Sequence, residues 1–236
     1  MPLSSAHQIT SIQFNEPHYP CRLYDLYDPP KTLYTCGNIE LLKQPMIAIV
    51  GSRGASTEGL KHAALFATAL SDAGILVISG LARGIDGSAH QAALTYKNRF
   101  STLAVCGTGL NRCYPAEHQG LAKEIIKNGL LMSELLPNEG PKAFHFPRRN
   151  RIIAALSLGV VVIQAANRSG SLITARLAAE LGREVFAVPG PIGDPLYMGC
   201  HQLIQQGAKL VCSPKEVLEE LPFLENPALT LLKERF

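Results

Sequence analysis

Hydrophobic residues along most of the chain fall into short runs, and several of these runs end at a glycine. Such runs, rich in Val, Ile and Leu, predict strands buried on both faces. The predicted strands cover residues 46–50, 75–79, 102–106, 130–133, 160–164, 184–188 and 209–212. Segments of helical composition separate them, at about 58–73, 86–96, 121–128, 147–156, 172–181, 201–206 and 214–221. Strands that alternate with helices predict an α/β fold with a mostly parallel sheet and helices on both faces.

The two ends of the chain lack this alternation. Residues 1–45 are rich in Pro, Tyr and polar residues, and predict an N-terminal arm or lead-in segment that packs on the core. Residues 46–221 are expected to form the main domain, and residues 222–236 a C-terminal linker or tail. The absence of a run of about eighteen apolar residues argues against a membrane span. The first fifteen residues have neither the basic start nor the apolar stretch of a secretory signal.

Composition adds little to this picture. The net charge of +3 permits an anionic partner, but nucleic-acid binding would need local clustering of basic residues. The six cysteines are scattered and form no C-x-x-C pair, so the spacing predicts reduced cysteines and no metal site. Cysteines of this kind are typical of a cytoplasmic protein.

Candidate chemistry gathers in the loops that follow the predicted strands. In open α/β sheets, ligands bind beyond the carboxyl ends of the strands. These loops are residues 51–54, 79–86, 107–112, 167–171 and 189–191, and four of the five pair glycine with arginine. Glycine permits close backbone approach, helix N-termini offer free N–H groups, and arginine binds phosphate with two hydrogen bonds. A single such loop is more often ordinary turn chemistry, but their convergence predicts an anionic ligand. Neither a G-x-G-x-x-G nor a Walker motif occurs.

The densest basic segment, residues 144–151, combines three arginines with two phenylalanines and a histidine at a predicted helix start. Basic groups interleaved with aromatic rings suit single strands, whose bases stack while the phosphates are neutralised. In the alternative interpretation the phenylalanines belong to the core and some arginines form structural ion pairs. For Arg151, which precedes the apolar Ile152 and Ile153, the two interpretations weigh equally.

Candidate catalytic residues are sparse. Asp86 and His90 lie at i and i+4 and could form an acid–base pair. A helix cap at Asp86 and a backbone hydrogen bond from His90 require fewer assumptions. Ser169 and Ser171 lack the G-x-S-x-G elbow of a nucleophile, and Glu134 has no identifiable partner. We therefore expect no catalytic residue and no cofactor.

The ordered set of loop motifs resembles the DNA-processing protein A family, DprA, also called Smf. The motifs are Gly51-Ser52-Arg53, residues 79–90, Tyr114-Pro115, Ser133-Glu134, residues 146–153, residues 169–175 and Pro189-Gly190. The resemblance covers about residues 17–221. It implies an extended Rossmann-like, doubly wound fold that binds single-stranded DNA without catalysis. Members protect incoming DNA during natural transformation (competence) and load the RecA recombinase onto it for recombination, usually as homodimers.

The resemblance also assigns residues to the DNA site. Arg53 stands at the position of the principal phosphate-binding arginine, Phe146 at an aromatic position, and Arg183 where relatives have a basic DNA contact. The full expected set is Gly51, Ser52, Arg53, Arg83, Phe146, Arg148, Arg149, Asn150, Arg151, Ser169, Gly170, Ser171, Thr174 and Arg183. The chain departs from the family pattern at Gln164, where an acidic residue is usual, and near Cys200-His201, where an asparagine is usual.

Two other functions remain open from the sequence. Phosphoribohydrolases that resemble lysine decarboxylases use similar glycine loops around a nucleotide. They would be expected to carry a Pro-Gly-Gly-x-Gly-Thr loop, whereas here Pro191 follows Pro189-Gly190. A protein-interaction scaffold with purely structural loops would not bind oligonucleotides even at low salt.

Overall fold

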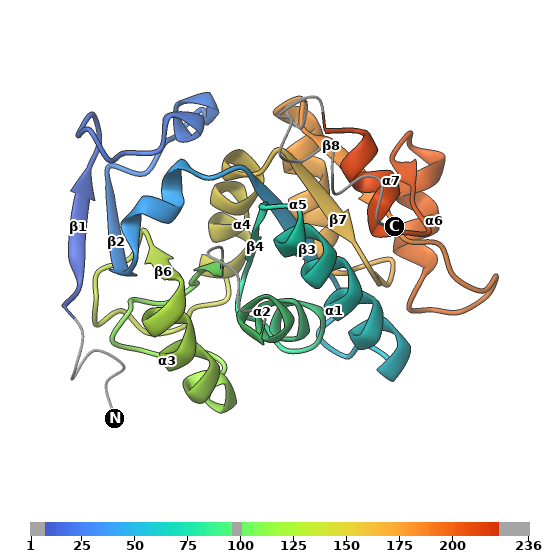
Figure 1. Ribbon diagram of the computed structural model, residues 1–236, viewed down its shortest axis with the longest axis horizontal. Coiled ribbons are helices and arrows are strands. Elements are labelled where there is room, and N and C mark those ends of the chain that lie inside the picture. The colour runs from blue at the N-terminus through green and yellow to red at the C-terminus, as the bar shows by residue number, and fades with distance from the viewer. Residues whose placement is uncertain (1–7, 96–100, 222–236) are drawn as a thin grey trace.

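The computed structural model describes residues 8–95 and 101–221, and its centre is one mixed sheet between two layers of helices (Figure 1). Within these residues the sheet has nine strands in the order β1-β2-β6-β5-β4-β3-β7-β8-β9. The parallel strands are β3 (Met46–Val50), β4 (Leu76–Ser79), β5 (Thr102–Val105), β6 (Leu130–Ser133), β7 (Gly159–Val162), β8 (Glu184–Ala187) and β9 (Lys209–Leu210). The predicted α/β class with a mostly parallel sheet is confirmed.

Helices cover both faces of this sheet. One layer holds α1 (Thr57–Asp72), α2 (Ile85–Thr95), α3 (Gln119–Asn128) and α7 (Pro214–Glu219). The other holds α4 (His145–Leu156), α5 (Gly170–Glu180) and α6 (Met198–Gln205). Because strand side chains alternate between faces, Ile47 and Ile49 of β3 pack in the first layer, whereas Met46 and Val50 pack in the second. The short 3-10 helices are η1 (Cys21–Asp25), η2 (Ile39–Lys43) and η3 (Ala116–His118).

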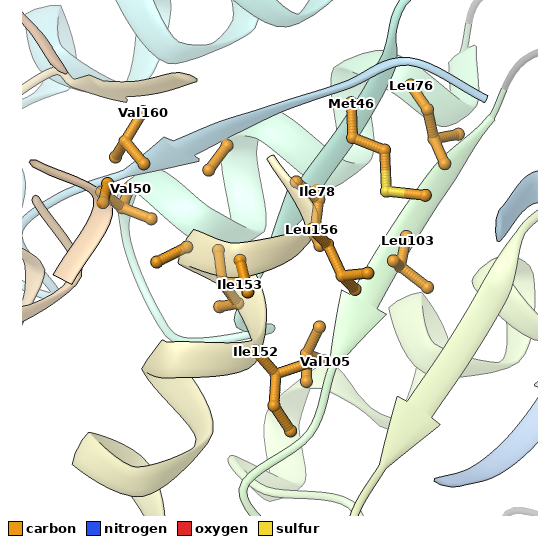
Figure 2. Packing of buried hydrophobic residues seen from close by; sticks show 14 of the residues in the cluster. Met46, Val50, Leu76, Ile78, Leu103, Val105, Ile152, Ile153, Leu156 and Val160 are labelled. Carbon is orange, nitrogen blue, oxygen red and sulfur yellow. The ribbon is translucent and has the colours of Figure 1, made fainter. Parts of the chain in front are cut away.

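Helix α4 is held on the sheet by its apolar side. Ile152, Ile153 and Leu156 pack against residues of β3, β4 and β5 (Figure 2). Full burial of each of these side chains contributes about 1.5–3 kcal/mol to the stability of the fold. After α4 ends, the Leu158 N–H donates to the Met46 carbonyl at 2.8 Å, at the start of β3. The first turn of α4 therefore lies toward the carboxyl ends of the strands.

The N-terminal segment adds two strands to the sheet. Strands β1 (Thr10–Gln13) and β2 (Thr32–Gly37) pair antiparallel with each other, and β2 pairs antiparallel with β6. Between them, Leu23 is fully buried and the Tyr19 hydroxyl donates to the Pro30 carbonyl at 2.7 Å. A domain boundary at residue 45 stays a prediction. The predicted tail, residues 222–236, lies outside the described residues.

The predicted elements differ from the observed ones mainly at their ends. The strand predicted over 75–79 begins at Leu76, and the helix predicted near Pro147 begins at His145. No helix in residues 8–95 or 101–221 combines the length and apolarity needed to cross a membrane.

Candidate nucleic-acid interface

The sheet reverses its winding direction at β3, which lies between β4 and β7. At such a switch point the loops after the two central strands diverge and leave a crevice for a ligand. A groove with a volume of about 830 Å³ opens there. Its walls come from the loop after β3, the loop after β4, the first half of α4, and the loop between β7 and α5.

The loops beneath the groove are interlocked. The Ser52 N–H donates to the Gln164 carbonyl at 2.7 Å, and the Ile85 N–H donates to the Ser52 carbonyl at 3.2 Å. Gly84 adopts a φ of +71°, and a Cβ there would lie 2.2 Å from the Ser52 oxygen. Only glycine fits this turn, which ties the loops after β3 and β4 together.

Gln164, where the family usually has an acidic residue, performs a structural role. Its Oε1 accepts the Ser56 N–H at 3.0 Å, and its Nε2 donates to Ser56 Oγ at 2.8 Å. Ser56 in turn caps α1 by accepting the Gly59 N–H at 3.1 Å. The amide supplies both a donor and an acceptor, which a carboxylate could not do.

The floor, defined here as Arg149, Asp86 and His90, is made of buried polar side chains, of which Arg149 and Asp86 line the groove. Arg149 is 5% exposed; its Nη1 donates to the Gly80 carbonyl at 2.6 Å and to the Val105 carbonyl. The Asp86 carboxylate accepts the N–H groups of Gly80 at 3.1 Å and Ala82 at 3.4 Å. Burial raises the pKa of Asp86, while Arg149 and these backbone donors oppose the rise. The floor therefore joins the ends of β4 and β5 to α4.

Asp86 and His90 act on the loop after β4. Asp86 is the second residue of α2 rather than its N-cap, so the cap predicted there is wrong. Thr102 Oγ1 donates to the Val77 carbonyl at 2.6 Å, so His90 Nδ1 must donate to Thr102 Oγ1, 2.7 Å away. His90 Nε2 then accepts the Leu81 N–H at 3.3 Å.

These contacts keep His90 neutral. Burial, with His118 and Arg149 nearby, lowers the pKa of His90 to about 3. Leu81 has a φ of +57°, an uncommon conformation for leucine. His90 contacts its N–H group and His118 its carbonyl group, and both contacts stabilise this conformation. The arrangement favours a loop-fixing role over an acid–base pair.

The rim of the groove, defined here as Arg53 and Arg168, carries exposed guanidinium groups. Across residues 8–95 and 101–221, neither has a carboxylate within ion-pair distance. The Arg53 Cζ atom lies 5.5 Å from the ring centroid of Phe146, a cation–π contact. Phe146 packs on Tyr114 with 5.1 Å between centroids. The rim thus places free positive charge beside an aromatic pair.

The start of α5 completes the groove. Ser169 is its N-cap and accepts the Ser171 N–H at 3.4 Å, and the two hydroxyls lie 2.7 Å apart. Asn150 Nδ2 donates to the Gly170 carbonyl at 3.2 Å, which fixes α4 against α5. The first turn of a helix carries partial positive charge and favours an anion.

The groove brings together ten of the fourteen expected residues. They are Gly51, Ser52, Arg53, Phe146, Arg149, Asn150, Ser169, Gly170, Ser171 and Thr174. Its lining contains four cationic side chains and one carboxylate, Asp86, in the floor. Within the described parts of the chain, no three His, Cys, Asp or Glu side chains cluster as metal ligands would.

Four expected residues lie elsewhere, each in an ion pair. Arg83 pairs with Glu117, and Arg148 and Arg151 both pair with Glu134 at 3.2 and 2.5 Å. Arg183 pairs with Asp25 and lines a neighbouring hollow of about 850 Å³ on the α5–α6 side.

Three lining residues that could meet a ligand through a positive charge or an aromatic ring were not in the expected set: Tyr114, Lys142 and Arg168. Arg168 stands in a glycine-containing loop after a strand, so the same signal that singled out Arg53 could have found it. Tyr114 belongs to the Tyr114-Pro115 motif of the resemblance but was not assigned to the DNA site, and Lys142 enters through a loop that has no such signal.

Comparisons with known proteins identify the family of this chain. Residues 10–222 match the family model described as DNA recombination-mediator protein A. The chain belongs to this family. Among curated members, DNA processing protein DprA of Streptococcus pneumoniae is 50% identical over 205 residues, which cover 87% of this chain and 72% of that protein. Protein Smf of Escherichia coli is 49% identical over 206 residues, which cover 87% of this chain and 54% of that protein.

Solved structures of DNA recombination-mediator protein A relatives share the fold. The X-ray structure of DprA from Streptococcus pneumoniae has a TM-score of 0.87 at 48% identity, covering 92% of this chain and 75% of that one. A structure of DprA from Helicobacter pylori, described as concerning its single-stranded DNA binding mode, has a TM-score of 0.84 at 29% identity and covers 99% of both chains. A molybdenum cofactor binding protein from Rippkaea orientalis, 15% identical with a TM-score of 0.53, shares the fold alone.

Proposed function

We propose that this chain binds single-stranded DNA through its phosphate backbone in the switch-point groove, without catalysis. The observation that carries the proposal is the pair of free rim guanidinium groups, Arg53 and Arg168, in the loops after the two central strands. The N-terminus of α5 lines the same groove. Together they offer a set of phosphate contacts that needs no bound metal.

The aromatic pair supports a single strand as the ligand. Tyr114 is 44% exposed, and Phe146 is partly exposed beside Arg53. An unpaired base can stack on such rings while its phosphate meets the arginine, whereas the bases of a duplex are already stacked on each other. The preference for single strands follows from this side of the groove.

The family supports the biological role. The match to a recombination-mediator family and the similarity to DprA of Helicobacter pylori favour a protein that protects incoming single strands in the cytoplasm. In this proposal the protein acts as a homodimer and loads the RecA recombinase onto the strand during transformation or recombination. Pull-down of RecA by the protein, with and without oligo-dT, tests the loading step, and no retention in either condition would refute it.

Titration of oligo-dT and of a duplex at two salt concentrations tests the binding mode. A groove that neutralises about 3–5 phosphates gives a log–log salt slope of roughly −2 to −3.5 for single strands. Arg53→Ala should weaken binding to every sequence and flatten this slope by about 0.7, because one phosphate contact is lost.

Lys127→Ala is the matched control. Lys127 is an exposed cation in the last turn of α3, just before β6, and so lies at the opposite edge of the sheet from the groove. It should bind as the wild type does. If Arg53→Ala and Lys127→Ala lose affinity and slope equally, binding is non-specific attraction to the surface and the groove assignment fails.

A further inference from the structure

A buried carboxylate holds the side of α4 that faces away from the groove. Glu134 follows β6, and its side chain is 7% exposed. Its Oε2 accepts Arg151 Nη2 at 2.5 Å and lies 3.2 Å from Arg148 Nη2. These three side chains are called the Glu134 cluster below.

The helical repeat separates the cluster from the DNA groove. Successive residues of an α-helix are about 100° apart around the axis, from 3.6 residues per turn. The α4 residues that line the groove are Phe146, Pro147, Arg149, Asn150 and Ile153, and they fall within an arc of about 160°. On the same scale Arg148 and Arg151 lie about 140–160° away from Phe146. Both arginines therefore lie outside the lining arc, and neither lines the groove.

The backbone around Glu134 is fixed on both sides. Ser133 Oγ donates to the Thr108 carbonyl at 2.8 Å and accepts the Leu135 N–H at 3.1 Å. The carboxylate is thus a fixed point to which α4 is attached, at a site independent of the apolar packing of Ile152 and Ile153.

The charges of the cluster depend on one another. Burial raises the pKa of Glu134, and Arg151 and Arg148 oppose this rise. The other groups that face Glu134 are Asp28 and Tyr19 from the N-terminal segment and His145 from α4. The Arg151 side chain is 13% exposed, and within the described residues its Nη1 has no hydrogen-bond partner. Neutralising Glu134 would leave this guanidinium without its counter-ion, and α4 would have to move to hydrate it.

We infer that Glu134 is a positioning residue for the groove: it sets the rotation of α4 that presents Phe146, Arg149 and Asn150 to the ligand. Arg148 and Arg151 then affect DNA binding only through this anchor. The inference rests on the proposed single-stranded DNA binding. It replaces the direct DNA contacts that the sequence led us to expect for these two arginines.

The experiment compares wild type, Glu134→Gln, Arg148→Ala and the double variant Glu134→Gln/Arg151→Met. Oligo-dT affinity is measured at two salt concentrations, and hydrogen exchange is followed in peptides from residues 145–156. Glu134→Gln should bind about tenfold more weakly, with the wild-type salt slope and faster exchange in α4. The double variant should recover part of the affinity, because the buried guanidinium of Arg151 is gone and that of Arg148 is exposed to water.

Arg148→Ala, at an exposed position that should not disturb folding, is expected to keep the wild-type salt slope. Glu180→Gln is the charge-matched control: Glu180 is exposed at the end of α5, and its loss should change neither binding nor exchange. The inference is overturned if Glu134→Gln binds more tightly with a steeper slope. It is equally overturned if Arg148→Ala flattens the slope by about 0.7, since the arginine would then contact phosphate.

Failure of the proposed function has a different signature. A wild-type protein that does not bind oligo-dT at low salt refutes DNA binding in the groove. The hydrogen-exchange data then test only whether Glu134 anchors α4. Unchanged exchange of α4 in Glu134→Gln would overturn this role.

Discussion

The rim and the floor of the groove carry arginines in opposite circumstances. Arg53 and Arg168 are exposed, and neither has a counter-ion in the described residues, so their charge is available to a ligand. Arg149, only a few ångströms of protein away, donates its hydrogen bonds to Gly80 and Val105 and lies near Asp86. The same residue type therefore offers free charge at one level of the site and builds its shape at the other. Proximity to a ligand groove does not by itself make an arginine a ligand contact.

The largest expected effect comes from removing the floor arginine. Arg149→Leu should destabilise the protein by about 3–5 kcal/mol, because Asp86 loses its buried counter-charge and two carbonyl groups lose their donor. Urea unfolding measures this difference. Arg53→Ala should change the free energy of unfolding by no more than about 0.5 kcal/mol. Equal losses in the two variants would erase the distinction between rim and floor.

A smaller effect is expected from the floor histidine. His90 has a pKa of about 3 in the folded protein, against an ordinary value of 6.5, so the stability that its neutral form contributes is fully present above pH 6.5. As the pH falls below 6.5, the unfolded chain gains a proton that the folded chain does not. Stability should therefore drop by about 2 kcal/mol between pH 6.5 and 5.

Urea midpoints at several pH values test this dependence. His90→Gln should be less stable than wild type at pH 7.5 but lose less stability toward pH 5. His18→Gln, at an exposed position, should keep the wild-type pH dependence. An unchanged dependence in His90→Gln would show that the pKa of His90 does not differ between the folded and the unfolded protein.

Next in size is a change at the boundary between floor and rim. A Cβ on Gly107 would lie 2.6 Å from the Phe146 ring, so Gly107→Ala must displace that ring. We expect a loss of about 1 kcal/mol in stability and a severalfold loss in oligo-dT affinity. Gly120→Ala is the control, since nothing lies within 4 Å of a Cβ there. Wild-type affinity in Gly107→Ala would exclude Phe146 from the binding surface.

The smallest effect on stability is expected at the rim. Arg168→Ala should leave the free energy of unfolding within about 0.5 kcal/mol of wild type. It should flatten the salt slope by about 0.7, as Arg53→Ala does. Measurement of both quantities on one sample sharpens the contrast with Arg149→Leu. A stability loss above about 1 kcal/mol in Arg168→Ala would show that Arg168 has a structural role, as Arg149 does.

The sequence predicted best those elements whose burial leaves a clear pattern of hydrophobic residues. Strands β3, β4 and β7 are continuous apolar runs because both of their faces are covered, and each was predicted. Strands β1 and β2 were not predicted. They lie toward one edge of the sheet, and β1 buries only Ile12, so they carry little of the apolar signal of a strand.

Local sequence patterns did not predict how the charged side chains of the site pair. The segment 148–151 presents three arginines as one basic cluster, but the helical repeat sends Arg149 to the floor and Arg148 and Arg151 to Glu134. Glu134 lies at the end of β6, before the loop that leads into α4, so no spacing rule pairs it with them. Loop motifs were enough to locate Arg53 and the start of α5. The pairing of the α4 arginines depends on the position and rotation of α4 in the folded protein, which no local motif encodes.

The strand pairing at the switch point has a consequence for synthesis of the protein. Strand β3 pairs with β7 through Ile47 and Gly159, residues more than a hundred positions apart in the chain. The groove has no walls until this pairing forms and α5 has followed. A ribosome must therefore synthesise the chain through α5 before the groove can form, so the groove is absent from shorter nascent chains.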